Sequence, residues 1–203
     1  MIKKTIFLIP GFKMQITDKP YRWLVEYLKS KKFKVVKVPI KWQRTTLTQL
    51  AESFKKFYDK KKKGENYLLG FSYGAVISLL VANDLKPRKI FLCSLSPDFK
   101  EDGKETKNWV KVLGKKRVAD IKTRNGREFA KNLQIPSTVF YGEKEGEQYP
   151  QLKIRNEETA RLARNSRLVV VKKAPHQIDY PAYMQAIKRE FEIVSVRRRA
   201  ISK

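Results

Sequence analysis

The sequence predicts an α/β fold: a doubly wound, mainly parallel six-stranded sheet with helices on both faces. Six short apolar runs, most of them rich in β-branched residues, alternate with segments that repeat apolar residues at helical spacing. Strands that are covered on both faces have such continuous apolar runs, which is typical of a parallel sheet. The 203 residues suffice for one well-filled core, so we expect a single domain over residues 1–203.

The first half of the chain predicts three strands, each followed by a helix. The strands are expected at residues 5–9, at residues 35–40 and directly before Ser72. Helical spacing follows at residues 21–28 and 47–58, and the helix after Ser72 is apolar nearly all round. Asp18 is expected to cap the first of these helices, and Thr45 or Thr46 the second.

The second half predicts three more strands, at residues 88–94, 137–142 and 167–171. Residues 99–133 show no strand pattern, and we expect a short helical insertion there that acts as a lid over a site. An acidic loop is expected over residues 142–150, and Asn156 is expected to cap the helix that follows it. The last helix should begin near Asp179 and Pro181, and residues 195–203 should form a basic C-terminal tail.

The charge of the chain is unusual for a globular protein. There are 46 Lys and Arg against 20 Asp and Glu, which gives a formal net charge of +26. Such a field attracts anions and polyanions at low salt. Because the lysines are spread over almost every segment, a solvated basic surface is the simpler interpretation, and polyanion binding is the open alternative.

Cysteine usage and the N-terminus indicate a cytoplasmic protein. Cys93 is the single cysteine, so no intramolecular disulfide can form, and a reducing compartment fits. The apolar run at residues 5–9 ends at Pro10-Gly11, too early for a signal peptide, and no stretch approaches the ~20 apolar residues of a membrane span. One histidine and one cysteine do not make a zinc site, and no calcium loop or dinucleotide fingerprint occurs, so no metal or cofactor is expected.

The motif with the most chemical content is Gly70-Phe71-Ser72-Tyr73-Gly74. It fits G-x-S-x-G, the pattern of a nucleophile elbow, in which a strained serine lies between a strand and a helix. Gly11, Asp98, Glu145 and His176 also follow predicted strands directly. The carboxyl ends of parallel strands meet at one edge of a sheet, so we expect these residues to gather around Ser72.

With these motifs the chain resembles the α/β-hydrolase family over nearly its whole length. The matching segments are the elbow, Ile9-Pro10-Gly11-Phe12, Gly142-Glu143-Lys144-Glu145 and Ala174-Pro175-His176. The order serine, acid, histidine is the order of that family. The leading antiparallel strands of full-size members are missing, so the chain resembles a small, minimal bacterial-type serine hydrolase.

The resemblance implies a role for each of the gathered side chains. Ser72 would be the nucleophile, His176 the general base, and Glu145 the acid that orients the imidazole. Asp98 is the rival for the acid, because some family members place it after the preceding strand. Glutamate at position 145 stands where the family commonly has aspartate.

The oxyanion hole would combine the backbone N–H groups of Phe12 and Tyr73, with Gly11 permitting close approach of substrate. Phe71 and Trp109 would contribute to an apolar acyl pocket. The leading hypothesis is therefore a serine hydrolase that cleaves a small carboxylic ester or thioester through an acyl-enzyme. The alternative is a non-catalytic or moonlighting binding protein on the same fold, whose basic surface binds nucleic acid or an anionic membrane.

Overall fold

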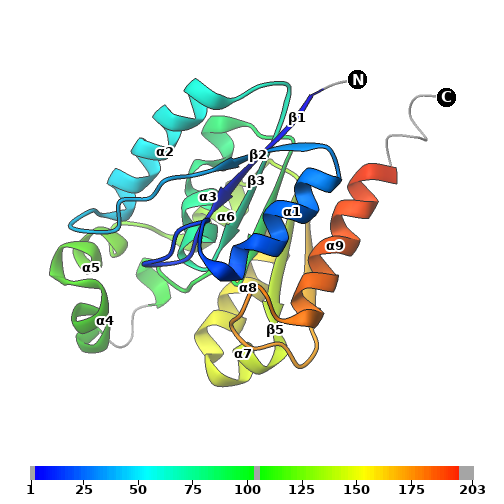
Figure 1. The fold of residues 1–203 in the computed structure, drawn as a ribbon. Helices are drawn as coiled ribbons and strands as arrows, with labels where there is room; N and C mark the ends of the chain where they lie inside the picture. The colour runs from blue at the N-terminus through cyan, green and yellow to red at the C-terminus, as the bar shows by residue number, and fades with distance from the viewer. Residues whose placement is uncertain (1–2, 103–105, 197–203) are drawn as a thin grey trace.

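The structure, a computed structural model, describes residues 3–102 and 106–196 (Figure 1). Its single sheet has six parallel strands in the order β2-β1-β3-β4-β5-β6. The strands are β1 (Lys4–Ile9), β2 (Phe33–Lys37), β3 (Glu65–Phe71), β4 (Lys89–Cys93), β5 (Ser137–Gly142) and β6 (Ser166–Val171). The predicted fold class is confirmed, and the sheet is parallel throughout.

Helices cover both faces of this sheet. One face packs against α1 (Arg22–Ser30) and α9 (Pro181–Val196), which lie side by side in Figure 1. The other face packs against α2 (Leu47–Lys61), α3 (Tyr73–Leu85) and α8 (Pro150–Leu162). The sheet contributes alternate side chains of each strand to the two apolar clusters, so two cores share one sheet.

The strand order reverses at β1, and this reversal positions the site. From β1 the chain crosses to β2 on one side, then returns to β3 on the other side and continues outward to β6. The loops that follow β1 and β3 therefore diverge to opposite faces and leave a crevice between them, where ligands bind in open α/β sheets. Gly11 follows β1 and Ser72 follows β3.

Residues 99–133 are mostly helical where the structure describes them, with short non-helical links at Gly114 and at residues 122–125. They form η2 (Lys100–Asp102), α4 (Thr106–Leu113), α5 (Lys115–Ile121) and α6 (Gly126–Asn132). Arg155 of α8 links this insertion to the rest of the domain through ion pairs. Its guanidinium is 1% exposed and lies 2.6 Å from Asp102 Oδ1 and 3.0 Å from Glu101 Oε1.

The expected acidic loop after β5 is wrong, because residues 143–148 form a helix, α7 (Glu143–Gln148). Carboxylates near a helix N-terminus are favourable, and Glu145 also accepts the Gly142 N–H, which ends the strand and begins the helix. Asn156 is likewise not a cap. It lies inside α8, where its buried amide bonds both the N–H and the carbonyl oxygen of Leu95.

The other predicted helix ends had mixed outcomes. Thr46 caps α2 through a reciprocal pair of bonds with Gln49, as expected. Asp18 makes no capping bond, and its carboxylate instead accepts the N–H of Gln15, ahead of the short helix η1 (Lys19–Tyr21). Residues 195 and 196 belong to α9 and not to a tail, and the rest of the predicted tail, 197–203, lies outside the described residues.

Candidate active site

Ser72 occupies a strained turn between β3 and α3. Its backbone has φ 54° and ψ −117°, a conformation that costs free energy for a residue with a side chain. A Cβ on Gly70 would lie 2.2 Å from the Gly74 carbonyl oxygen, and one on Gly74 would lie 2.3 Å from that of Ile9. Only glycine fits at both positions, which is the reason for the G-x-S-x-G spacing. The Ser72 N–H donates to the Cys93 carbonyl at 2.8 Å and fixes the turn to β4.

His176 connects Ser72 with Glu145. Its Nε2 lies 3.2 Å from Ser72 Oγ, and its Nδ1 contacts Glu145 Oε1. The Phe71 ring, with its centroid 4.9 Å from that of the imidazole, supports one side. The start of α7, which carries Glu145, packs closely on the loop that carries His176, since a Cβ on Gly142 would lie 2.2 Å from the Ala174 carbonyl oxygen. Three side chains that are far apart in sequence thus form one hydrogen-bonded chain.

Glu145 is fully buried and is held by two donors besides the imidazole. Its Oε2 accepts from the Gly142 N–H at 2.8 Å and from Ser94 Oγ at 2.9 Å. Because the Ser94 hydroxyl donates to Glu145, the Tyr183 hydroxyl, 2.9 Å away, donates to Ser94. Burial raises the pKa of Tyr183 well above its usual value, so Tyr183 keeps its proton. Sequence reasoning missed Ser94 and Tyr183, although Ser94 directly follows β4 at the same sheet edge.

Asp98, the rival acid, does not contact His176. It follows β4 in the chain and is 6% exposed, and its carboxyl interacts with Ser96 and Asp102. Burial raises the pKa of Asp98 to about 6, with a hydrogen bond from Ser96 opposing the rise and nearby Asp102 adding to it. The geometry selects Glu145 as the carboxylate beside the imidazole.

Two backbone N–H groups near Ser72 are available to a ligand. Among the described residues, neither the Phe12 N–H nor the Tyr73 N–H has a hydrogen-bond acceptor. The Gly11 N–H, in contrast, donates to the Tyr21 hydroxyl at 2.9 Å. A Cβ at Gly11 would lie 3.5 Å from Ser72 Cβ, so glycine keeps the approach to the serine open. The arrangement suits an oxyanion beside Ser72.

Two cavities open onto Ser72 and His176. The first has a volume of about 310 Å³ and is lined by Phe71, Phe12 and Met14 among others. The second, of about 660 Å³, is lined by Ser96, Pro97 and residues 148–152 at the start of α8. No described residue of the 99–133 insertion lines either cavity, and residues of α7 and α8 form the wall of the second; the lid stays a prediction. The Trp109 side chain lies outside the described side chains.

In residues 3–102 and 106–196 no helix is long and apolar enough to cross a membrane. The same residues contain no group of three or more His, Cys, Asp or Glu side chains that could hold a metal ion.

The fold and the site define an α/β protein with a serine, a histidine and a buried glutamate at the carboxyl edge of its sheet. The sequence matches no protein-family description and no curated protein. Solved structures, however, share its architecture over almost the whole chain. It is similar to Est1E from Butyrivibrio proteoclasticus, with a TM-score of 0.74 at 16% identity, covering 96% of this chain and 88% of that one.

Two further structures give the same result. The Pyrococcus furiosus esterase PF2001 has a TM-score of 0.73 at 15% identity, covering 97% of this chain and 82% of that one. The mouse α/β hydrolase domain-containing protein 10 has a TM-score of 0.72 at 12% identity, covering 95% and 90%. The chain therefore has the α/β-hydrolase fold, and the resemblance that its motifs suggest is confirmed at the level of the fold.

Proposed function

We propose that the protein is a serine hydrolase that cleaves a carboxylic ester or thioester with Ser72, His176 and Glu145. The observation that carries the proposal is the continuous contact from Ser72 Oγ through the imidazole to a buried carboxylate. A serine hydroxyl needs an adjacent base to attack a carbonyl carbon, and a base needs a partner that fixes its tautomer. The site supplies both.

In the first half of the reaction, Ser72 Oγ bonds to the carbonyl carbon of the substrate while its proton passes to His176 Nε2. The negative charge that develops on the carbonyl oxygen is stabilised by the N–H groups of Phe12 and Tyr73. The tetrahedral intermediate collapses, the bond to the leaving oxygen or sulfur breaks, and the leaving group takes the proton from His176. An acyl-enzyme on Ser72 remains.

Water completes the cycle. It gives a proton to His176 Nε2 and bonds to the acyl carbon, and the Ser72 ester bond then breaks as Ser72 recovers that proton. The carboxylic acid leaves and the enzyme is restored. Glu145 orients the imidazole in both halves and stabilises the imidazolium.

The structural neighbours support an ester as the substrate. The Pyrococcus furiosus protein PF2001 is described as an esterase, and one Est1E structure is described with ferulic acid bound. The cavity lined by Phe71, Phe12 and Met14 offers apolar surface beside Ser72. Ester hydrolysis on an apolar acyl group is the reaction that this surface fits best.

A fluorophosphonate probe tests the proposal directly, because it phosphonylates an activated serine. Labelling of the wild type is expected to disappear in Ser72→Ala and to fall strongly in His176→Ala. Ser96→Ala, which removes a neighbouring serine of the same wall, should label normally. Labelling that persists in Ser72→Ala would rule out Ser72 as the nucleophile.

Ser94 is expected to act as a positioning residue. Ser94→Ala removes one of the two fixed donors to Glu145 Oε2, so we expect kcat to fall by about 10-fold while KM stays within about twofold. Ser137→Ala is the matched control, because this buried serine has a hydroxyl without a hydrogen-bond partner among the described residues. Equal kinetics of Ser94→Ala and Ser137→Ala on a p-nitrophenyl ester would contradict the role.

Asp98→Asn is expected to leave kcat within about threefold of the wild type and to change the pH dependence of stability. The folded-state pKa of about 6 exceeds the ordinary value of 3.8, so the native state binds the proton more tightly. The contribution of Asp98 to the free energy of unfolding is therefore fully present below pH 4. It is lost as the pH rises through 6, by ~3 kcal/mol.

Urea unfolding at several pH values measures this effect. Asp98→Asn should be more stable than the wild type at pH 8 and nearly equal to it at pH 3.5. The exposed Asp59→Asn variant should show no such trend. A large loss of kcat in Asp98→Asn would instead restore Asp98 as the triad acid.

The alternative, a non-catalytic binding protein on the same fold, is not favoured by the esterase and hydrolase structures that it resembles. The basic surface of the protein is nevertheless compatible with catalysis. Retention on heparin that falls with salt stays a prediction from the net charge of +26.

A further inference from the structure

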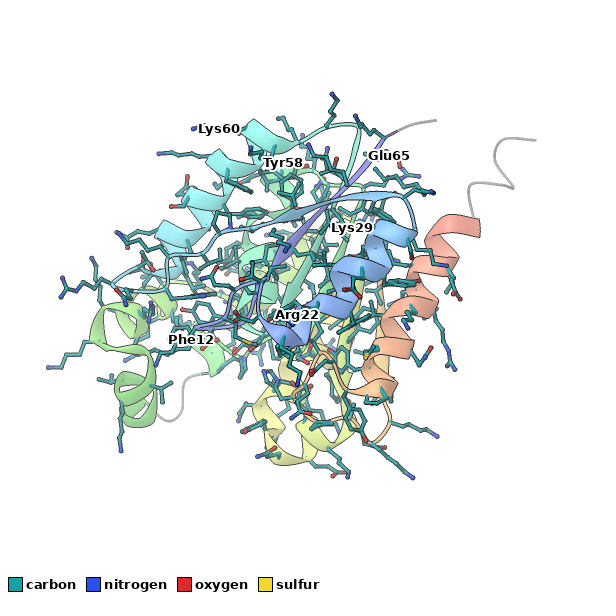
Figure 2. All side chains as sticks on the ribbon, in the orientation of Figure 1. Phe12, Arg22, Lys29, Tyr58, Lys60 and Glu65 are labelled. Atoms are coloured by element: carbon teal, nitrogen blue, oxygen red, sulfur yellow. The ribbon has the colours of Figure 1, made fainter. Side chains whose placement is uncertain are left out.

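A basic cavity adjoins the candidate active site. We define it by Phe12, Lys13, Lys41, Trp42, Arg44 and Arg117, and its volume is about 490 Å³. The loop after β1 forms the wall between it and the smaller Ser72 cavity. Gly11 and Met14 line the Ser72 side, Lys13 lines the basic side, and Phe12 lines both. Figure 2 shows the labelled Phe12 beyond the end of β1, toward the side of the molecule where α5 lies.

The charges of this cavity have one sign. Four cationic side chains line it, and no acidic side chain of the described residues does. Among the described residues none of the four has an ion pair. Cations that converge on one concavity repel one another, and an anion bound between them removes that repulsion.

Arg117 is the most informative of the four. Its Nε donates to the Thr45 carbonyl at 2.7 Å, and its guanidinium lies 4.9 Å from the centroid of the Phe12 ring. Its Nη2 is buried and has no hydrogen-bond partner among the described residues, and the same holds for the Tyr73 hydroxyl, whose ring also packs against Phe12. Buried polar atoms without partners are rare, and an anion in the basic cavity would accept a hydrogen bond from this Nη2.

The cavity differs from the rest of the basic surface. Lys29 and Lys60, for example, are exposed on the outer helices α1 and α2 (Figure 2), where water solvates them. In the basic cavity Lys13, Lys41 and Arg44 are exposed as well and Arg117 is half-buried, but these cations surround an aromatic wall. Trp42 is 8% exposed, its indole N–H donates to the Met14 carbonyl, and its ring packs edge-on against Phe12 at 5.6 Å. The cations are therefore placed around a shaped, partly apolar surface next to the oxyanion N–H of Phe12.

We propose that the basic cavity binds an anionic group, a carboxylate or a phosphate, of the same substrate whose ester or thioester carbonyl lies at Ser72. The proposal rests on the proposed function and names its substrate class: an ester or thioester that carries a negative charge. Arg117 supplies the fixed guanidinium, and Lys13, Lys41 and Arg44 add charge around it. The substrate spans Phe12, so binding of its anion holds the carbonyl close to the oxyanion N–H groups.

Matched ester pairs test the proposal. One pair is p-nitrophenyl hexanoate and the mono-p-nitrophenyl ester of adipic acid, which differ by a terminal carboxylate. The second pair is phenyl acetate and phenyl acetate with a para phosphate on the leaving group. The wild type should prefer the anionic member of at least one pair in kcat/KM, and Arg117→Gln should reduce that preference by about 10- to 100-fold. The preference is a ratio within a pair, so a general loss of turnover in the variant lowers both members and leaves the ratio unchanged.

Controls separate this site from the general charge of the protein. Arg161→Gln makes the same charge change at a side chain that is 71% exposed, and its preference should equal that of the wild type. Lys41→Gln, an exposed residue of the cavity, should weaken the preference even if Arg117→Gln folds poorly. If Arg161→Gln lowers the preference as much as Arg117→Gln, long-range attraction explains it and the assignment is wrong.

A binding measurement needs no turnover. Inorganic phosphate and adipate should change the tryptophan fluorescence of the wild type saturably, and the change should be absent from Trp42→Phe and Arg117→Gln. Absence of that change, together with hydrolysis of neutral esters and no anion preference, would overturn the anion site and leave the hydrolase intact. Binding without hydrolysis of any ester would reject the proposed function instead.

Discussion

Glu145→Gln is expected to lower kcat by about 10⁴-fold while the fold remains intact. Both fixed donors, the Gly142 N–H and the Ser94 hydroxyl, point at Oε2, so glutamine keeps its carbonyl oxygen there. Its NH₂ group then faces His176 Nδ1, which must accept a hydrogen bond, and the imidazole proton moves to Nε2. An Nε2 that already carries a proton does not take one from Ser72, and this loss of the correct tautomer has an effect of about that size in related triads.

Steady-state kinetics on a p-nitrophenyl ester measures the effect, and urea unfolding checks the fold. Glu147→Gln is the matched control, because it makes the same chemical change at an exposed position of the same helix. We expect its kcat to equal that of the wild type. A kcat for Glu145→Gln within about 10-fold of the wild type would mean that another group orients the imidazole.

Asp102→Ala is expected to lower the free energy of unfolding by about 3 kcal/mol or more. Asp102 is the main partner of Arg155, whose guanidinium is 1% exposed, and it also accepts the Phe99 N–H. Removing it leaves a buried cation whose remaining ion-pair partners among the described residues are Glu101 and Glu158. Breaking a buried pair of this kind typically costs about 3–5 kcal/mol. The insertion should loosen from α8 first.

Asp84→Ala is the control, because Asp84 pairs with Lys55 at 2.7 Å on the surface, where water solvates both partners. Its effect should stay below about 1 kcal/mol. The double variant Asp102→Ala with Arg155→Met removes the unpaired charge and should regain part of the lost stability. Equal unfolding free energies for Asp102→Ala and Asp84→Ala would show that the buried pair does not stabilise the fold.

Local patterns predicted the fold well. The six strands occur where apolar runs placed them, with boundaries that differ by at most three residues, because such runs record burial on both sides of a sheet. The predictions were wrong where a short stretch of sequence is compatible with two different local structures. Residues 143–148 read as a polar loop, and the helix α7 forms there because Glu145 bonds back to the Gly142 N–H. Asn156 has the side chain of a cap, yet its buried bonds to Leu95, 61 residues away, fix it inside α8.

The candidate site was likewise predicted only in part. The sequence named Ser72, Glu145 and His176 and offered two carboxylates for one role, because both follow strands at the same edge. Only the three-dimensional contacts distinguish them, since Glu145 contacts His176 and Asp98 does not. The support of Glu145 by Ser94 and Tyr183 has no sequence signal of its own, because a serine and a tyrosine 89 residues apart form no recognisable motif.

The sequence by itself determined the α/β architecture, the glycines around the elbow, and the serine and histidine available for chemistry, because each of these depends on neighbouring residues or on residue types. The tertiary structure alone decided which carboxylate meets the imidazole, which segments wall the cavities at Ser72, and how four cations of the basic cavity converge beside Phe12. Those features are distances between residues far apart along the chain, and the packing of helices on the sheet sets such distances.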